Sequence, residues 1–219
     1  MENEIKKRGR LFVLSAPSGS GKSTVTDMIL KRLPDLVYSV SYTTRPPRPG
    51  ETDGVEYNFI SVERFKEMIG RDEFLEWAEV FGRFYGTGRA WVEEKLSAGR
   101  DVLADLDVVG AASVRKIMPE ATLVFMVPPT AGELGRRLVS RRTESPEEAR
   151  RRLGRARTEV DSRHIYDFLL VNDDVERAAD ELAQIIRQGR GRPMAETESF
   201  WSAFFDDEME PHPMTAASD

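Results

Sequence analysis

The strongest constraint on the fold is an apolar run that leads directly into a glycine-rich turn and then into an amphipathic segment. Residues 10–15 read RLFVLS, a pattern typical of a buried parallel strand. Residues 16–21 are small and suit a tight turn. Residues 23–33 carry apolar side chains at helical spacing, and Pro34 ends that pattern. A strand, a turn and a helix in this order predict the opening of a parallel α/β sheet.

The turn matches the phosphate-binding pattern G-x-x-x-x-G-K-[ST], except that Ala16 stands at the first glycine. Gly19 and Gly21 allow backbone N–H groups to face phosphate oxygens, and the helix start adds its positive dipole end. We expect Lys22 to contact the β- and γ-phosphates of a nucleotide and the Ser23 hydroxyl to bind Mg²⁺. An ordinary strand-to-helix turn is the alternative, but the flanking strand and helix favour nucleotide binding. The predicted set is Ala16, Pro17, Ser18, Gly19, Ser20, Gly21, Lys22, Ser23 and Thr24.

Later segments fit the same sheet, with two exceptions. Residues 39–87 are rich in Pro, Gly, Tyr, Thr and charge, which indicates an inserted α+β lobe. Residues 136–163 are predicted to form a peripheral helical hairpin. The other predicted elements are strands over 101–109, 121–127 and 167–171 and helices over 92–98, 131–140, 146–161 and 175–187.

Composition excludes several classes of site. The 219 residues contain no Cys and two His, which excludes a disulfide scaffold, a Cys-ligated zinc and a His-cluster metal site. The mean hydropathy of -0.46 and the absence of an apolar run of about 18 residues argue against a membrane-spanning helix. A net charge of -6 disfavours general nucleic-acid binding. The first ten residues lack the apolar stretch of a signal peptide, so we expect a cytoplasmic protein.

The charge is unevenly distributed. Residues 190–219 contain 2 Arg and 7 acidic residues, so much of the net acidity lies at the C-terminal end. Residues 136–163 contain 10 Arg and 5 acidic residues. This basic stretch is either a solvated, salt-bridged surface or a set of arginine forks that bind an anionic ligand.

Further motifs complete a family pattern. Residues 41–51 read SYTTRPPRPGE, and Gly54, Tyr57 and Phe59 follow. With the phosphate-binding turn, this segment resembles guanylate kinase, and the T-T-R-x-P-R-x-G-E pattern makes the resemblance specific. It extends from about residue 11 to 187. The later matching pieces are FLEWA at 74–78, YGT at 85–87, DLDVVGA at 105–111, PP at 128–129, RL at 137–138, Arg141, RL at 152–153 and VNDD at 171–174.

The resemblance implies an α/β fold: a P-loop NTPase core with a central parallel sheet, an inserted α+β nucleoside-monophosphate-binding lobe and a helical, Arg-rich lid. It implies a domain over 1–190 and leaves 191–219 as an acidic C-terminal extension. The core would take about 8–38, 91–130 and 164–190, the lobe 39–90 and the lid 131–163. The implied reaction is phosphoryl transfer from ATP, with Mg²⁺, to GMP, giving ADP and GDP in purine nucleotide metabolism. The implied ligands are ATP and GMP, with no nucleic acid or membrane partner; use of dGMP and oligomeric state stay open.

The resemblance also assigns an acceptor site. Ser41, Arg45, Arg48 and Tyr57 would hold the acceptor phosphate, because two Arg forks and a phenol suit a dianion, and Tyr85 would complete this grip. Glu76 would accept hydrogen bonds from guanine N1–H and the exocyclic amine, and Thr87 would donate to O6. The alternative for Glu76 is an exposed carboxylate placed outward by strand alternation.

Two carboxylates close the predicted strand over 101–109. Asp105 and Asp107 are expected on one face of that strand, at the sheet edge where ligands bind. The resemblance implies that they orient the guanosine and hydrated Mg²⁺, with Asp107 a second candidate for the metal; a structural strand-end cap is the alternative. Two departures from the family are Val109, where glutamine is usual, and Arg142, where glycine is usual.

The lid arginines of the family match Arg137, Arg141 and Arg152. They would stabilise charge on the transferred phosphoryl group, so the predicted catalytic set is Lys22, Arg45, Arg137, Arg141 and Arg152. Asn172 is a candidate for contacts on the ATP side, with a turn-forming role as the alternative. A related P-loop kinase with another acceptor and a non-catalytic scaffold are the competing functions.

The C-terminal extension carries four aromatic residues within six positions. Phe200, Trp201, Phe204 and Phe205 would form a stripe on a helix, followed by acidic residues. The stripe predicts docking on the body, on a partner or on a second subunit. The alternative is a disordered extension with chance aromatics.

Overall fold

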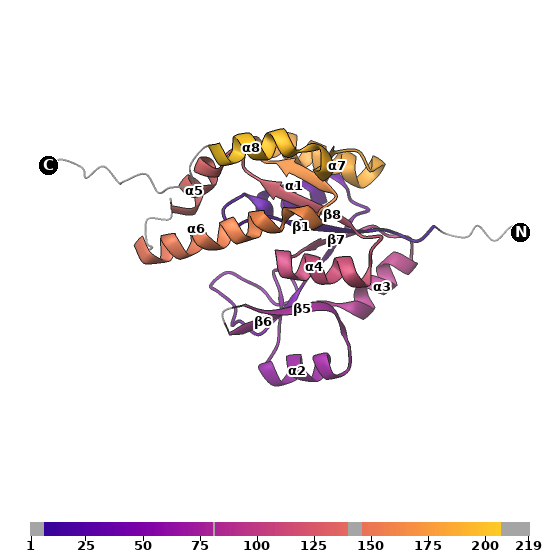
Figure 1. The fold of residues 1–219 in the computed structure, drawn as a ribbon. Helices are drawn as coiled ribbons and strands as arrows, with labels where there is room; N and C mark the ends of the chain where they lie inside the picture. The colour runs from indigo at the N-terminus through magenta and orange to yellow at the C-terminus, as the bar shows by residue number, and fades with distance from the viewer. Residues whose placement is uncertain (1–6, 81, 140–145, 207–219) are drawn as a thin grey trace, which may run out of the picture. The chain divides into compact units, whose positions relative to one another are not determined.

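The computed structural model describes residues 7–80, 82–139 and 146–206. It has a mixed α/β fold with a central parallel sheet, as predicted (Figure 1). The elements are β1 Leu11–Ser15, α1 Lys22–Arg32, β2 Val37–Ser39, β3 Tyr42–Thr43, β4 Asn58–Phe59, α2 Val62–Gly70, β5 Phe74–Val80, β6 Arg83–Gly88, α3 Arg89–Ser97, β7 Val102–Asp105, α4 Val108–Ile117, β8 Thr122–Val127, α5 Ala131–Val139, α6 Pro146–Asp161, η1 Ser162–Ile165, β9 Phe168–Val171, α7 Val175–Gln188, β10 Arg192–Pro193, η2 Met194–Glu196 and α8 Glu198–Asp206.

The chain divides into two compact units. The first takes Met1–Ser15 and Leu30–Leu123, and the second takes Ala16–Ile29 and Val124–Asp219. The boundary at Ser15 falls where β1 ends and the phosphate-binding turn begins, so the turn and α1 as far as Ile29 belong to the second unit.

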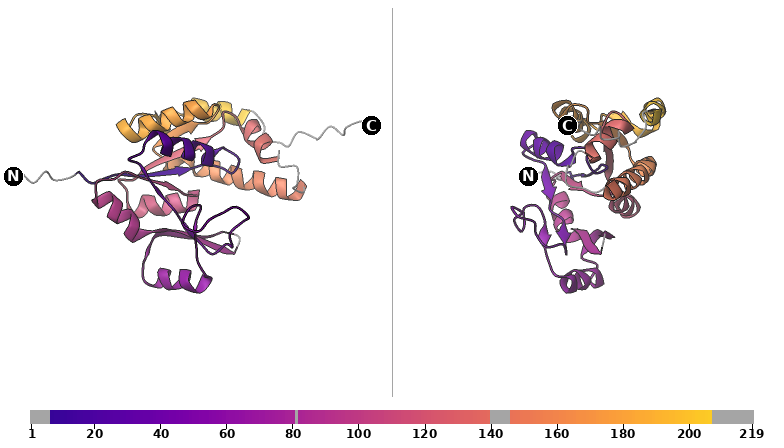
Figure 2. Two further views of the ribbon diagram at one scale, coloured as in Figure 1. Left: turned by 180° about the vertical axis from the view of Figure 1, so that it is seen from behind. Right: turned by 90° about the vertical axis from the view of Figure 1, so that its left-hand side faces the viewer.

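The first unit holds a parallel three-stranded group and a separate four-stranded sheet. β7 pairs in parallel with both β1 and β2. The separate sheet has the strand order β4-β3-β6-β5, and α2 covers it in both Figure 1 and Figure 2. Ser61 caps α2 by accepting from the Arg64 N–H at 3.1 Å, and Phe65 of α2 stacks on Phe74 at a centroid distance of 4.3 Å. These aromatic contacts give the small sheet a core of its own.

The second unit surrounds the remaining strands with helices. β8 pairs in parallel with β9, and β9 pairs antiparallel with β10. α7 begins at the cap Asp174, whose carboxylate accepts from the Arg177 N–H at 2.9 Å. It ends at Gly189, which has a φ of 63° and adopts the left-handed conformation. The buried side of α7 supplies alanine, leucine and isoleucine side chains to the core.

The predicted strand over 101–109 is wrong beyond Asp105. Asp107 is the N-cap of α4, and its Oδ1 accepts from the N–H groups of Val109 and Gly110 at 3.1 and 2.9 Å. The apolar run therefore spans the end of β7 and the first turn of α4, where Val109 is exposed. A carboxylate that satisfies helix N–H groups stops the strand within an otherwise continuous apolar segment.

The helix α8 covers the second unit near β8. Trp201 is 6% exposed, and its ring lies 6.3 Å from that of Phe125. The Trp201 Nε1–H donates to Thr197 Oγ1 at 3.0 Å, and the Arg163 Cζ lies 4.9 Å from the indole centroid. α8 also packs beside α5, as Figures 1 and 2 show. Residues 207–219 lie outside the described residues.

Every helix within the described residues is too short or too polar to cross a membrane.

Candidate active site

The phosphate-binding turn depends on two glycines in the left-handed conformation. Gly19 and Gly21 both have a φ of 86°, a region that other residues rarely adopt. The turn is closed by the Ser20 N–H, which donates to the Pro17 carbonyl at 3.1 Å. The Val25 N–H donates to the Gly21 carbonyl at 3.2 Å and continues the chain into α1. The turn and helix therefore have the strand–turn–helix geometry that the motif predicts.

The Asn172 side chain is hydrogen-bonded to the backbone of the turn. Its side chain is 2% exposed, and its Nδ2 donates to the Ser20 carbonyl at 2.7 Å. A Cβ on Gly21 would lie 2.6 Å from that same nitrogen, so only glycine fits. Asn172 thus supports the turn, a role that neither sequence interpretation included, and its predicted contact with ATP stays a prediction.

Two of the three predicted lid arginines lie at this turn. Arg152 donates to Ser18 Oγ at 3.0 Å and to the Leu138 carbonyl at 3.2 Å. Arg137 donates from Nε to Glu133 at 2.7 Å and from Nη1 to the Asn172 carbonyl at 3.3 Å. These hydrogen bonds place two guanidinium groups around the turn. Arg141 lies outside the described residues.

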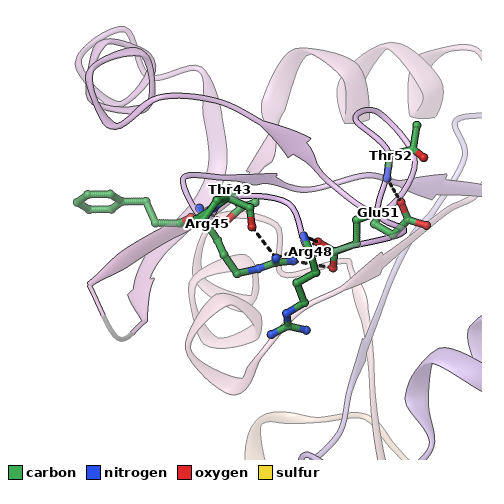
Figure 3. A network of polar contacts seen from close by, with 8 residues as sticks. Thr43, Arg45, Arg48, Glu51 and Thr52 are labelled. Atoms are coloured by element: carbon green, nitrogen blue, oxygen red, sulfur yellow. Dashed lines mark hydrogen bonds and ion pairs between the residues drawn. The ribbon is translucent and has the colours of Figure 1, made fainter.

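Two of the predicted acceptor-phosphate residues, Arg45 and Arg48, contact the same carboxylate, that of Glu51, in the first unit (Figure 3). Arg45 donates to both oxygens of Glu51, at 2.9 and 2.8 Å. The Arg48 N–H also donates to Glu51, at 2.7 Å. The first cause that raises the pKa of Arg45 is its hydrogen bonding to Glu51, and Arg45 in turn lowers the pKa of the Glu51 carboxyl. Both groups are therefore charged at neutral pH.

Aromatic side chains surround the Arg45 guanidinium. Its Cζ lies 5.4 Å from the ring centroid of Tyr57 and 5.6 Å from that of Phe59. The rings of Tyr57 and Tyr85 are 5.9 Å apart. Burial, followed by the negative charge of Asp105, raises the pKa of the Tyr57 phenol, which therefore stays protonated as a hydrogen-bond donor. Ser41 stands beside this group, where its carbonyl accepts from the Asn58 N–H at 2.9 Å.

Glu76 is buried, and the alternative of an exposed carboxylate is wrong. Its side chain is 7% exposed, and its Oε1 accepts from the Thr87 hydroxyl at 2.7 Å. The register between β5 and β6 shifts between Phe74 and Glu76, so the strict alternation of inward and outward side chains fails there. Burial raises the pKa of the Glu76 carboxyl to about 7, despite the opposing hydrogen bond from Thr87.

Gly110 allows the first turn of α4 to approach Glu76. A Cβ on this glycine would lie 2.7 Å from Glu76 Oε2. Asp107 caps the same turn and adds a negative charge that contributes to the raised pKa of Glu76. Asp105 is the last residue of β7, and its negative charge helps to raise the pKa of Tyr57. The two aspartates therefore serve different elements and do not share a strand face.

Glu51 and Gly110 were not among the predicted site residues. Glu51 was visible as the last letter of the T-T-R-x-P-R-x-G-E segment, but a spacing of six residues does not reveal an ion pair to Arg45. Gly110 follows the two aspartates in sequence, but its closeness to Glu76 comes from the packing of α4 against β5.

The chain is similar to known proteins over most of its length. The family model described as guanylate kinase matches residues 8–189. The chain is 51% identical over 183 residues to a guanylate kinase of Shewanella denitrificans, covering 83% of this chain and 88% of that protein. It is 48% identical over 181 residues to one from Dechloromonas aromatica, covering 82% and 89%. A crystal structure of guanylate kinase from Anaplasma phagocytophilum aligns with a TM-score of 0.68 and 34% identity, over 86% of this chain and 90% of that one.

Proposed function

Because the chain belongs to the guanylate kinase family and phosphorylates GMP to GDP at the expense of ATP, we propose a division of that reaction between its two compact units. The predicted ATP-binding residues that the structure describes fall in the second unit, from Ala16 to Thr24 and at Asn172. The predicted GMP-binding residues, from Ser41 to Asp107, all fall in the first. Each unit would thus bind one substrate.

The donor phosphates bind at the turn and the start of α1. Gly19 and Gly21 direct backbone N–H groups to the phosphates, the helix dipole adds positive potential, and Lys22 supplies a full charge. Arg137 and Arg152 stabilise the charge that builds on the transferred group, because phosphoryl transfer depends mainly on positioning and electrostatics. Their hydrogen bonds to Asn172 and Ser18 support this role.

The residues at the start of α1 fit a magnesium ion that arrives with ATP. The described residues contain no group of three or more His, Asp or Glu able to hold a metal by themselves. Ser23 is exposed at the second residue of α1 and offers one hydroxyl oxygen. A nucleotide-borne Mg²⁺ needs few protein ligands, since phosphates and water fill most of its octahedron. When bound, the ion would neutralise phosphate charge.

The acceptor phosphate binds to Arg45, Arg48, Tyr57 and Tyr85, beside Ser41. Arg48 and the protonated Tyr57 phenol supply donors, and the dianionic phosphate already carries the attacking oxygen. Guanine binds at Glu76, which accepts hydrogen bonds from the ring N1–H and the exocyclic amine. Thr87 has one hydroxyl hydrogen, which Glu76 accepts in this structure. Thr87 therefore donates to guanine O6 only when its hydroxyl turns away from Glu76.

The buried Glu76 carboxylate is the observation that carries the assignment of guanine recognition. An adenine ring offers no N1–H and has its amine elsewhere, so it leaves this carboxylate unpaired. Leaving a buried polar group unpaired rejects the wrong substrate strongly. The same unit also contains Arg45 and Arg48, so base and phosphate are recognised within one part of the chain.

An acceptor screen tests this proposal. With ATP and Mg²⁺, we expect GMP to be phosphorylated far more efficiently than AMP or UMP, and the Lys22→Ala variant to lose activity. The same screen decides whether dGMP is accepted. Preference for a non-guanine acceptor would overturn the role of Glu76, and equal turnover by Lys22→Ala would overturn the role of the turn.

The C-terminal extension, up to Asp206, is proposed to dock on the body and not on a partner. Burial of Trp201 and Phe204 supports this assignment. Cytoplasmic location stays a prediction.

A further inference from the structure

We infer that Glu51 is a positioning residue for the acceptor phosphate: its carboxylate fixes the Arg45 guanidinium and the turn that carries Arg48, and leaves the Arg48 guanidinium available to the phosphate. This inference rests on the proposed function of the two arginines. Glu51 itself touches neither substrate in this scheme.

The hydrogen bonds of Arg45 to Glu51 and to the Pro46 carbonyl use only part of its guanidinium, which also interacts with the Tyr85 hydroxyl. Nη1 donates to Glu51 Oε2 at 2.9 Å and to the Pro46 carbonyl at 2.8 Å, and Nη2 donates to Glu51 Oε1 at 2.8 Å. These bonds use three of the five N–H donors of an arginine. The two that Glu51 and Pro46 do not use, Nε–H and one hydrogen of Nη2, lie on the same edge, and such an edge can hold two oxygens of a phosphate. Glu51 thus orients Arg45 without occupying its phosphate-binding edge.

Glu51 also closes the turn that carries Arg48. Its Oε2 accepts from the Arg48 N–H at 2.7 Å, and its own N–H donates to the Arg48 carbonyl at 3.0 Å. Main chain and side chain therefore tie residues 48 and 51 together. Reduced freedom of this turn lowers the conformational cost of binding at residue 48.

The Arg48 guanidinium differs from that of Arg45. Within the described residues it makes no hydrogen bond or ion pair, and no dashed contact reaches it in Figure 3. Arg48 is exposed, whereas the side chains of Arg45 and Glu51 are mostly buried as an ion pair whose net charge is zero. The Arg48 side chain therefore supplies the uncompensated positive charge of this turn.

A different role for Glu51 predicts the opposite change in GMP binding when Glu51 is removed. If Glu51 acted as a substitute anion that the phosphate must displace from Arg45, its removal would tighten GMP binding. If Glu51 positions the arginines, its removal weakens GMP binding. The sign of the change in the KM for GMP therefore distinguishes the two.

The test compares Glu51→Ala, Glu51→Gln and the control Glu56→Ala. Glu56 lies in the same loop, and within the described part of the chain it accepts only from the Thr52 N–H, at 2.7 Å. For Glu51→Ala we expect the KM for GMP to rise about 10-fold or more, from the loss of charge-assisted hydrogen bonds. We expect kcat at saturating GMP and the KM for ATP to change less than about twofold. Glu51→Gln keeps a side-chain oxygen and should recover part of the loss, and Glu56→Ala should match the parent.

Guanosine, which lacks the phosphate, is the second probe. Its affinity should be the same in the parent and in both Glu51 variants, because Glu51 acts on the phosphate end alone. A matching loss of guanosine and GMP binding would reveal a general distortion of the lobe and overturn the inference. An unchanged or lower KM for GMP in Glu51→Ala would overturn it as well.

Arg48→Ala separates failure of this inference from failure of the proposed site. If Arg48→Ala weakens GMP binding and Glu51→Ala does not, the phosphate site stands and the role of Glu51 is wrong. If neither variant changes GMP binding, the phosphate site itself is wrong and the inference falls with it.

Discussion

At the scale of single residues, Glu76 faces two opposing demands. Guanine recognition requires an ionised carboxylate, whereas burial favours the neutral acid and raises its pKa to about 7. The Thr87 hydroxyl offsets part of the burial cost by donating to Oε1. The free protein therefore holds a mixture of the two forms near neutral pH.

This titration predicts a pH-dependent affinity for guanosine. Only the ionised carboxylate accepts both guanine donors, so affinity should rise as pH increases through about 7. A group with that pKa is ionised in about one molecule in ten at pH 6, so the Kd should fall about 10-fold between pH 6 and pH 8. Calorimetry with guanosine measures this without interference from a titrating phosphate. The Glu76→Gln variant should bind weakly with no such trend, and a flat profile in the parent would contradict the assignment.

The same pKa predicts that Glu76→Gln stabilises the protein. Raising a carboxyl pKa from 4.5 to about 7 on folding destabilises the folded state as pH rises, because the unfolded chain releases its proton first. Below pH 4.5 both states are protonated and the variant should gain little. The increase in the free energy of unfolding of Glu76→Gln over the parent should grow between pH 4.5 and 7 towards at most ~3 kcal/mol. Denaturant unfolding of parent and variant across this range tests the trend, and a gain that shrinks with pH would refute it.

At the scale of elements, the phosphate-binding turn and β9 are locked together through Gly21 and Asn172. The asparagine amide both supports the Ser20 carbonyl and occupies the space that a side chain at residue 21 would need. The turn therefore depends on residues separated by about 150 positions. Such a contact belongs to tertiary structure and is not evident from the local motif.

Gly21→Ala should be far more damaging than a substitution at another left-handed glycine. Gly189 has a φ of 63°, and outside its chain neighbours no atom of the described residues lies within 4 Å of the position that a Cβ would take, so Gly189→Ala carries only backbone strain, about 1–2 kcal/mol. Gly21→Ala adds displacement of the buried Asn172 amide, which costs a further ~1–3 kcal/mol. Unfolding midpoints compare the two variants. The KM for ATP should rise only for Gly21→Ala, and equal effects would contradict the packing argument.

The prediction of helices and strands from the sequence was accurate where the spacing of apolar residues indicated one type of element only. The helix over 146–161 has the predicted bounds, and 175–187 differs by one residue. It failed at 101–109, because an apolar run does not distinguish a strand from the first turn of a helix, and because Asp107 was interpreted as a strand residue and not as a cap. The bulge beside Glu76 was equally invisible, since a register shift depends on the partner strand.

Most residues of the candidate site were predicted from sequence motifs, and fewer from the chemistry of the residues themselves. A P-loop can be derived from residue types, whereas the acceptor residues were identified only through a family pattern. What neither route supplied were contacts between motifs: the ion pair of Arg45 with Glu51 and the packing of Gly110 on Glu76. Such contacts depend on how elements assemble, so they require a structure.

At the scale of the whole molecule, α8 lies beyond the residues that the family model matches, yet two of its aromatic side chains, Trp201 and Phe204, are buried in the second unit. Trp201 packs against Phe125 of β8 and under Arg163. The residues that the family model matches therefore include Phe125 and Arg163 but not the Trp201 side chain that packs on both.

Trp201→Ala should destabilise the protein by ~3 kcal/mol or more, as expected for truncation of a buried aromatic residue. Phe205→Ala is the matched control: the same helix carries it, but it is 44% exposed, so the cost should stay below ~1 kcal/mol. Thermal or denaturant unfolding measures both. Equal, small losses would mean that α8 contributes little to the core.

The distribution of tryptophan gives each compact unit its own optical reporter. Trp77 and Trp91, 42% and 37% exposed, belong to the first unit, and the buried Trp201 is in the second. Indole emission shifts to longer wavelength in water, so the two environments emit differently. Trp77 directly follows Glu76 in β5, and its fluorescence should respond when guanine binds. A Trp77→Phe, Trp91→Phe protein would then emit from the second unit alone, so loss of structure in either unit can be followed without an added dye.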